Sequence, residues 1–230
     1  AVYNVPIELP IGTNKLKPNL SLIYSSQQGD GTVGVGWSIQ GITEINISPD
    51  AWYYDEETEN IEIDGEDKFS MDGGRLFSTS GTYGSNGTTY GTEVETYKKV
   101  TSYGFAGLPD WFKVETKDGI TMELGKTEDS KYRHGTGQVV RWRISKMYDT
   151  HGNYVEFKYR TEGEESLIDR ILYTGNASQG VDPYNVVKFR YSVRNDKNSR
   201  FISGKRIRSN HLLDKIQIHS NGHHLSLIHI

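Results

Sequence analysis

Three glycines near the N-terminus have the G-x-G-x-x-G spacing of a dinucleotide-binding loop: Gly29, Gly31 and Gly34. Such a loop binds a pyrophosphate because it leads from a strand into a helix whose N-terminal amides meet the phosphate. The next residues here, VGVGWSIQ (33–40), alternate in type, which predicts a strand with glycine kinks and no helix. We therefore expect no nucleotide at this loop, and we expect Trp37 to cover the space beside the glycines.

Two other groups have side chains of the types that perform acid–base chemistry or bind metals. Glu62 and Asp64 are spaced to share one face of a strand, as the carboxylate pair of a glycosidase must, but solvated acids explain them more simply. Four histidines, a common type of zinc ligand, gather near the C-terminus: His219, His223, His224 and His229. We expect neither group to form a site, and the sequence predicts no catalytic, metal-binding or cofactor-binding residues.

Composition narrows the classes of partner. The chain has 230 residues, no cysteine, a net charge of -4 and a pI near 6.0, which gives no general attraction to nucleic acid or to an anionic membrane. Charges are interspersed, apart from an acidic segment at 50–67 and a basic segment at 190–208. No apolar run approaches the ~20 residues of a membrane helix, so neither nucleic acid binding nor direct membrane insertion is expected.

Apolar residues recur with a period of two, the pattern of half-buried antiparallel strands. In four segments the apolar residues are expected to face the core and the residues between them to face water. The core-facing residues are Leu20, Leu22 and Tyr24; Val140, Trp142 and Ile144; Val155, Phe157 and Tyr159; and Val187, Phe189, Tyr191 and Val193. In the second of these segments, Arg141, Arg143 and Ser145 are expected to face water. Turn signals such as Asp72-Gly73 and Asp118-Gly119 separate the strands. Residues 112–124 and 139–160 read as hairpins, and 78–92 as a long loop or a hairpin excursion.

The predicted fold class is therefore all-β, with many short antiparallel strands and hairpins and little or no helix. It is either a β-sandwich or a segment of an open β-shell. The best helical candidate is the short segment at 162–172, which is interrupted by Gly163 and allows one or two turns at most.

Both ends of the chain carry a separate expectation. Ala1 is not methionine, so we expect an N-terminal part to be missing. The last six residues, Leu225–Ile230, match one reading frame of the mosaic end of a transposon used to build sequencing libraries. We expect residues 1–224 to be a β-rich domain from a longer protein and 225–230 to be an adaptor artefact, with a genuine apolar strand end as the alternative for these six residues.

The N-terminal stretch VPIELPIGTNKLKPNLSLIYSSQQGDGTVGVGWSIQG resembles the N-terminal domain family of the Salmonella virulence plasmid protein B (SpvB), which is also found in the B components of Tc toxins and in Rhs/YD-repeat proteins. The resemblance continues in DKFSMDGGRL, YGTE, KDG, YDTHGN, ILYTGN and VKFRYSVRND, and so reaches to about His224. The residues that carry it most clearly are Pro6, Pro10, Gly12, Pro18, Tyr24, Gly31, Gly34, Gly36, Trp37, Asp72, Gly73, Arg75, Asp149, Gly152 and Asn153.

This resemblance implies a structural, non-enzymatic module of a secreted bacterial toxin. Such a module forms part of a β-shell that encapsulates or delivers a C-terminal toxic domain. Its partners are then the remainder of its own polypeptide and a pore-forming toxin subunit, and it needs no cofactor. A free-standing cell-surface adhesion or glycan-binding module is the first alternative, favoured by an exposed aromatic patch.

A less favoured alternative comes from the same family, since the plasmid-virulence member carries a separate ADP-ribosyltransferase domain. Enzymes of that kind use an arginine, then Ser-Thr-Ser, then Glu-x-Glu, and this chain has Arg75, Ser78–Ser80 and Glu93–Glu95 in that order. The three elements lie so close in sequence that separate core strands cannot present them. We therefore expect no transferase site.

Overall fold

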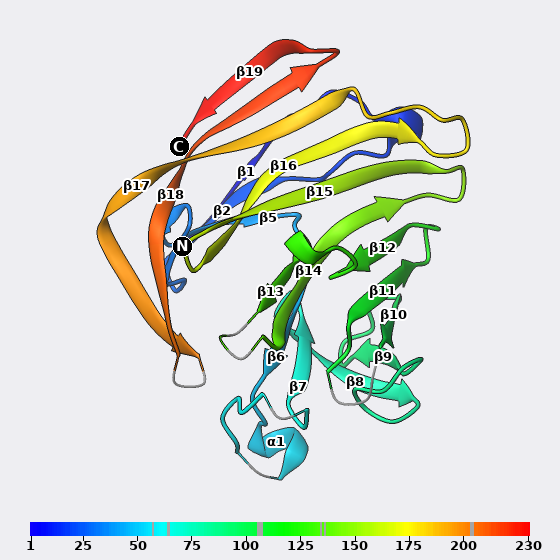
Figure 1. Ribbon diagram of the computed structural model, residues 1–230, viewed down its shortest axis with the longest axis vertical. Coiled ribbons are helices and arrows are strands. Elements are labelled where there is room, and N and C mark those ends of the chain that lie inside the picture. Colours follow the sequence, from blue (N-terminus) through cyan, green and yellow to red (C-terminus); the bar gives the residue numbers. More distant parts are fainter. Residues whose placement is uncertain (57, 64, 105–107, 134, 136, 203–204) are drawn as a thin grey trace. The chain divides into compact units, whose positions relative to one another are not determined.

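The computed structural model describes residues 1–56, 58–63, 65–104, 108–133, 135, 137–202 and 205–230 (Figure 1). Strands dominate these residues, and among them helix is confined to α1 (Trp52–Asp55) and two 3-10 turns, Thr13–Lys15 and Glu128–Ser130. The all-β prediction is confirmed. The chain divides into two compact units: Ala1–Ile42, Tyr148–Arg200 and Arg206–Ile230 form the first, and Thr43–Met147 and Phe201–Lys205 form the second.

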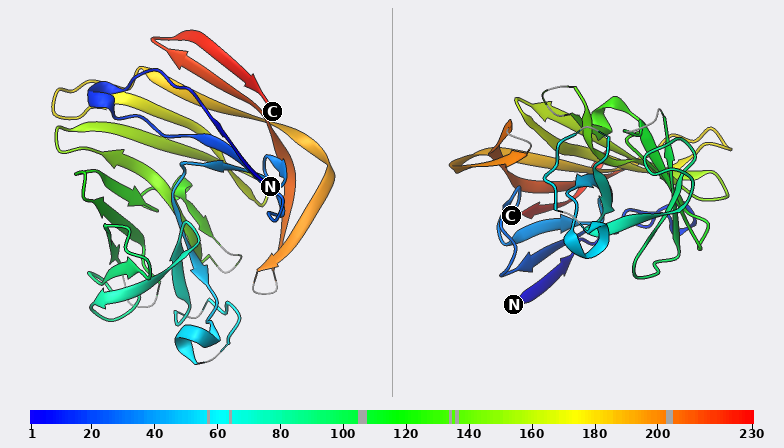
Figure 2. Two further views of the ribbon diagram at one scale, coloured as in Figure 1. Left: turned by 180° about the vertical axis from the view of Figure 1, so that it is seen from behind. Right: turned by 90° about the horizontal axis from the view of Figure 1, so that it is seen from below.

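The first unit contains short N-terminal strands and long C-terminal ones. The short strands are β1 (Val2–Pro6), β2 (Ser21–Ser25), β3 (Asp30–Gly31), β4 (Gly34–Val35) and β5 (Trp37–Gln40). They form a sheet in the order β1-β2-β5 and the separate pair β3-β4. The long strands are β15 (Asn153–Glu162), β16 (Glu165–Asn176), β17 (Asn185–Ile202), β18 (Lys205–Ser220) and β19 (His223–His229). They pair in sequence order and run side by side in Figure 2.

The predicted alternation explains β15 directly. Val155, Phe157 and Tyr159 are buried, whereas Glu156 and Lys158 between them are half-exposed. In β17, Val187 and Phe189 are buried as predicted, but Val193 is 67% exposed and Arg194 is buried in its place. That part of the prediction was wrong, because the parity of burial shifts by one residue where Arg194 finds acidic partners.

In the second unit, eight strands among the described residues form a closed circuit. They are β6 (Glu44–Ser48), β7 (Lys68–Met71), β8 (Gly74–Ser80), β9 (Thr89–Thr92), β10 (Lys98–Tyr103), β11 (Trp111–Thr116), β12 (Thr121–Leu124) and β14 (Val139–Tyr148). Each pairs with the next in the order β12-β11-β10-β9-β8-β7-β6-β14, and β12 also pairs with β14, which closes the barrel. The short β13 (Lys131–Arg133) pairs with β14. This unit is therefore neither a sandwich nor an open sheet.

Aromatic rings fill the barrel. The ring of Phe69 stacks on that of Tyr83 at 5.2 Å and meets Phe112 and Trp142 edge-on at 5.3 and 5.6 Å. Phe69, Phe112 and Trp142 have no exposed surface, and the Trp142 indole N–H donates to the carbonyl of Pro109 at 3.0 Å. Edge-to-face packing of this kind is the favourable geometry for buried rings.

The two predicted hairpins and the hairpin excursion have the expected strands. β11 and β12 pair with Phe112 opposite Leu124, β14 and β15 flank the turn at 149–152, and β8 pairs with β9 with Ser80 opposite Thr89. Two details of the sequence prediction were wrong. The helical candidate at 162–172 is a turn at Gly163, whose φ is +62°, followed by β16. Arg143 and Ser145 are buried although the alternation predicts that they face water. Burial is possible because Arg143 donates a hydrogen bond to the carbonyl of Asp129, and Ser145 donates one to the carbonyl of Glu123.

Candidate functional site

The glycine-rich loop forms a tight hairpin and not a phosphate cradle. Asp30 pairs with Val35 and Gly31 with Gly34, and the amide of Gly36 donates to the carbonyl of Gly29 at 3.1 Å. The chain then enters strand β5, so the predicted strand is confirmed. Since no helix begins there, the loop lacks the helix N-terminus that binds a dinucleotide phosphate.

Gly36 allows an aromatic ring to lie against the backbone. Its φ is +79°, and a Cβ atom on it would lie 2.6 Å from Cε2 of Tyr24. The ring of Tyr24 packs on that of Trp37, with 5.3 Å between centroids. Tyr24 thus lies over this glycine, and Trp37 supports Tyr24.

A buried arginine holds the same loop from the other side. Arg194 on β17 is 1% exposed, and its Nη2 donates to Oδ2 of Asp30 at 2.5 Å. Its Nε donates to Asp196 at 3.1 Å, and its Nη1 to the carbonyl of Gly31 at 3.4 Å and to Ser209 at 3.2 Å. The hydrogen bond that Arg194 donates to Asp196 is the largest of the effects that raise the pKa of Arg194, so the guanidinium stays charged. Sequence reasoning missed this residue, because nothing in the basic segment distinguishes Arg194 from its neighbours.

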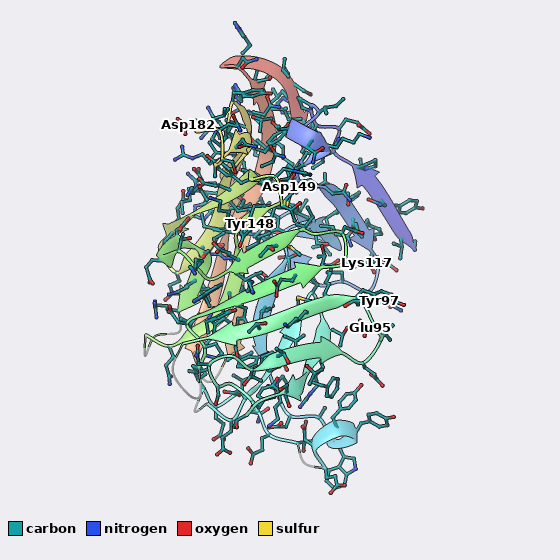
Figure 3. All side chains as sticks on the ribbon, turned by 90° about the vertical axis from the view of Figure 1, so that its right-hand side faces the viewer. Glu95, Tyr97, Lys117, Tyr148, Asp149 and Asp182 are labelled. Carbon is teal, nitrogen blue, oxygen red and sulfur yellow. The ribbon has the colours of Figure 1, made fainter. Side chains whose placement is uncertain are left out.

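Asp149 is the centre of a second cluster. Its Oδ1 accepts hydrogen bonds from the amides of His151 (2.8 Å) and Asn153 (3.0 Å). Its Oδ2 accepts from the Nδ2 atoms of Asn153 (2.8 Å) and Asn14 (3.2 Å). Burial by itself would raise the pKa of Asp149, but these donors favour the carboxylate and hold the pKa below its usual value. Figure 3 labels Asp149 beside Tyr148, where β14 ends.

The turn at 149–153 interlocks with the loop after β16. Asn176 donates through Nδ2 to Oδ1 of Asn153 at 2.7 Å, and the amide of Ala177 donates to the carbonyl of Gly152 at 2.8 Å. Gly152 has a φ of +81°, and a Cβ atom there would lie 2.2 Å from Oγ of Ser178. Glycine is thus required both by the backbone angle and by the neighbouring side chain.

The N-terminal loop is attached to β16 as well. The hydroxyl of Tyr173 donates to the carbonyl of Pro10 at 3.2 Å, and that of Thr13 donates to the carbonyl of Thr174 at 3.1 Å. A Cβ atom on Gly12 would lie 1.7 Å from the carbonyl oxygen of Leu16, so no larger residue fits this turn. We name residues 10–14, 149–153 and 173–178 the turn cluster. Of the other motif prolines, Pro6 ends β1 and pairs with Ser21, and Pro18 is buried before β2.

Arg75 is engaged by carboxylates in the second unit. Asp72 and Gly73, with φ of +50° and +87°, form the predicted turn between β7 and β8. Arg75 lies just beyond this turn on β8, and its Nη2 lies 2.7 Å from both carboxylate oxygens of Asp55. Its Cζ is 5.4 Å from the ring centroid of Tyr54. The pairing is internal, so the guanidinium is already neutralised.

The transferase-like residues lie at or after strand β8, and their charged members have partners within the protein. Ser78–Ser80 lie at the exposed end of β8. Glu93 accepts a 2.5 Å hydrogen bond from the hydroxyl of Tyr54, which together with burial raises the pKa of that tyrosine. Glu95 accepts the amide of Tyr97 at 2.5 Å. Arg75 pairs with Asp55, and both Arg75 and Glu93 contact Tyr54.

The paired carboxylates and the C-terminal histidines do not form a metal cluster among the described residues. Asp64, one of the paired carboxylates, lies outside the described residues. The rings of His219 and His224 meet edge-on at 5.1 Å. Within the described ranges, no three His, Cys, Asp or Glu side chains are grouped so that they could hold a metal ion. None of the described helices is long and apolar enough to cross a membrane.

Comparisons with known proteins agree with the motifs. The family model described as Salmonella virulence plasmid 65kDa B protein matches residues 1–179. The solved N-terminal domain of effector protein SpvB from Salmonella typhimurium strain LT2 is 18% identical, with a TM-score of 0.76 over 97% of this chain and 91% of that one. No curated protein matches the chain.

Larger toxin structures contain the same fold. One is a Photorhabdus luminescens Tc holotoxin pore, which contains a chain that is 16% identical and matches with a TM-score of 0.76. Another is a crystal structure of TcdB2–TccC3, which contains a chain that is 18% identical and matches with a TM-score of 0.74. In both cases the match covers 95% of this chain and 13% of the other. At these identities the likeness shows a shared fold. Since the family model covers most of its length, the chain belongs to the Salmonella virulence plasmid 65kDa B protein (SpvB) family.

Proposed function

We propose that residues 1–224 are a non-catalytic structural module of a larger bacterial toxin or Rhs-like protein, where they form part of a β-shell around a C-terminal toxic domain. One observation carries this proposal. The fold of 95% of this chain recurs in Tc toxin chains of which it makes up only 13%, so in those proteins the fold is one part of a much longer polypeptide.

The internal contacts support a structural role. Two charged motif residues have partners within the protein: Asp149 accepts four hydrogen bonds in the turn cluster, and Arg75 pairs with Asp55. Contacts of this kind would stiffen the module, as a wall of a shell requires. β1 is exposed along all five residues, and an edge strand of that kind is suited to pair with a neighbouring part of a shell.

The proposed partners are inferred from the same likeness. They are the remainder of the polypeptide and a pore-forming toxin subunit, because one similar structure is a Tc holotoxin pore. The protein would be made in the bacterial cytoplasm and act outside the cell. No cofactor is needed for this role.

The test is protease protection of the full-length protein encoded in the source organism, together with its structure by electron cryo-microscopy. We expect residues 1–224 in the wall of a closed shell and a C-terminal domain that resists protease. The variant Arg194→Met, which removes a buried ion pair from the wall, should increase cleavage of that domain. A C-terminal domain that is cut equally fast in both proteins, or a module tethered outside any shell, would contradict the proposal.

A second candidate is a cell-surface adhesion or glycan-binding module. Trp52 and Tyr53 favour it, because both rings are largely exposed on α1 and sugars stack on such rings. Binding of the chain to immobilised neutral glycans, lost in Trp52→Ser, would support this function. Binding to none of them would leave the shell role.

A further inference from the structure

Helix α1 presents an exposed aromatic surface. This single turn lies in the connection between β6 and β7, at the lower end of the second unit in Figure 1. Its first three residues are aromatic, and Trp52, Tyr53 and Tyr54 are 70%, 82% and 40% exposed. Large rings usually lose most of their exposure on folding, and a contiguous exposed group marks a contact surface.

Hydrogen bonds and ring contacts hold the aromatic surface in place. Asp55 closes the turn by accepting the amide of Ala51 at 2.8 Å, and the amide of Tyr54 donates to the carbonyl of Ala51 at 2.8 Å. The ring of Tyr54 packs edge-on against Tyr53 at 4.8 Å and against Phe77 of β8 at 5.1 Å. The aromatic surface is thus fixed to the barrel and preorganised for binding.

One ring of this group, that of Tyr54, already packs against a cationic side chain of the protein itself, Arg75. The guanidinium of Arg75 lies 5.4 Å from the ring of Tyr54 and 5.9 Å from that of Phe77, and Asp55 pairs with it at 2.7 Å. An aromatic face combined with a carboxylate is a favourable environment for arginine or lysine. Trp52 and Tyr53 expose their rings, and Glu56, which directly follows α1, is exposed as well, so the same residue types are available to a partner.

The negative charge of the surrounding segment favours a positively charged partner. Residues 50–67 contain nine acidic residues and no lysine or arginine, in a chain whose net charge is only -4. Glu56, Glu59 and Glu62 are exposed. This segment repels nucleic acid and anionic lipid, and it attracts positive charge over roughly 8 Å at physiological salt.

We propose that the α1 surface, formed by Trp52, Tyr53 and Glu56, docks a lysine- and arginine-rich segment of a protein partner. The rings contact the cationic side chains, and the carboxylates steer and pair with them. The docking surface does not depend on the shell role, because it concerns the exposed side of the second unit alone.

The test uses the whole 230-residue chain and a fluorescent probe peptide of arginine and lysine separated by glycine and serine. We expect saturable binding by fluorescence anisotropy that weakens as salt rises. The double variant Trp52→Ser/Tyr53→Ser should bind roughly tenfold more weakly, since each exposed cation–π contact contributes a few-fold. Tyr97→Ser is the matched control, because Tyr97 is 64% exposed and Figure 3 shows it apart from α1.

Four results would overturn the proposal. The first is that the double variant binds the peptide as tightly as the wild type does. The second is that a peptide with glutamate in place of the basic residues binds equally well. Neutral glycans bind at α1 while the basic peptide does not, which would assign the surface to sugars. Sedimentation reveals self-association that the double variant abolishes, which would make a second copy the occupant. Circular dichroism of the double variant should match the wild type, because both replaced rings are mostly in solvent.

Discussion

Asp30 and Arg194 are 164 residues apart in the sequence, yet Oδ2 of Asp30 lies 2.5 Å from Nη2 of Arg194. The arginine is almost fully buried, and it also bonds the carbonyl of Gly31. The interaction therefore connects the glycine hairpin of the N-terminal segment to the long strand β17. A loop whose spacing resembles a nucleotide site is instead held by a side chain of its own protein.

Arg194→Met should destabilise the first unit by about 3 kcal/mol, because removing one member of a buried ion pair leaves the other charge without full compensation. Urea unfolding followed by tryptophan fluorescence measures the change. Arg190→Met is the control, since Arg190 is exposed and bonds Gln217 at the surface; its expected effect is below about 1 kcal/mol. Equal effects of the two variants would show that the Asp30 pair has no special role.

Gly36→Ala should lower the free energy of unfolding by about 1–3 kcal/mol, whereas Gly29→Ala, in the G-x-G-x-x-G motif that precedes Gly36, should be nearly neutral. The first position has φ +79° and a ring at 2.6 Å from the added Cβ, but a Cβ on Gly29 meets no atom within 4 Å. Thermal unfolding of the two variants checks this difference. If the loop bound a nucleotide through its glycines, NAD would stabilise the wild type in the same assay, and we expect no such shift.

Asp149→Asn should weaken the turn cluster by about 1–2 kcal/mol at neutral pH, because amide donors that now meet a carboxylate would meet a weaker acceptor. The pKa of Asp149 is lowered in the folded protein from its usual value of 3.8. Its stabilising effect is therefore fully present above pH 3.8 and is lost as the pH falls through the folded-state pKa. The stability difference between wild type and variant should shrink over that acidic range.

Stability curves of both proteins from neutral pH into this range provide the measurement. Asp182→Asn serves as the control, since Asp182 is exposed on the loop after β16. A difference for Asp149→Asn that stays constant with pH would mean that its carboxylate charge does not stabilise the turns.

The chain should transfer no ADP-ribose from NAD to proteins of a cell lysate. Arg75 is paired with Asp55, and Glu95 accepts a hydrogen bond from the amide of Tyr97, so both side chains already have partners within the protein. Radiolabelled NAD followed by gel autoradiography measures transfer. Labelling by the wild type that disappears in Glu95→Gln would reject the non-enzymatic assignment.

Local patterns predicted much of this fold because strands and turns depend on near neighbours. The alternation at 154–159 assigned the buried face of β15 correctly, and Asp72-Gly73 predicted a turn that has the expected positive φ angles. The same rule failed at Val193 and at Arg143, where a distant acid or a carbonyl makes burial of an arginine favourable. It also could not predict the closure of the barrel by β12 and β14, which are separated by a turn and a further strand.

By itself, the sequence determined the all-β class, the positions of the hairpins and the family, because periodicity, turn residues and short motifs are local properties. Only the tertiary structure decided what the motif residues do. It brought Asn14, Asp149 and Asn176 into one turn cluster, paired Arg75 with Asp55 and left Trp52 in solvent. The physical reason is that hydrogen bonds and ion pairs between segments depend on distances in space, and sequence separation does not reveal those distances.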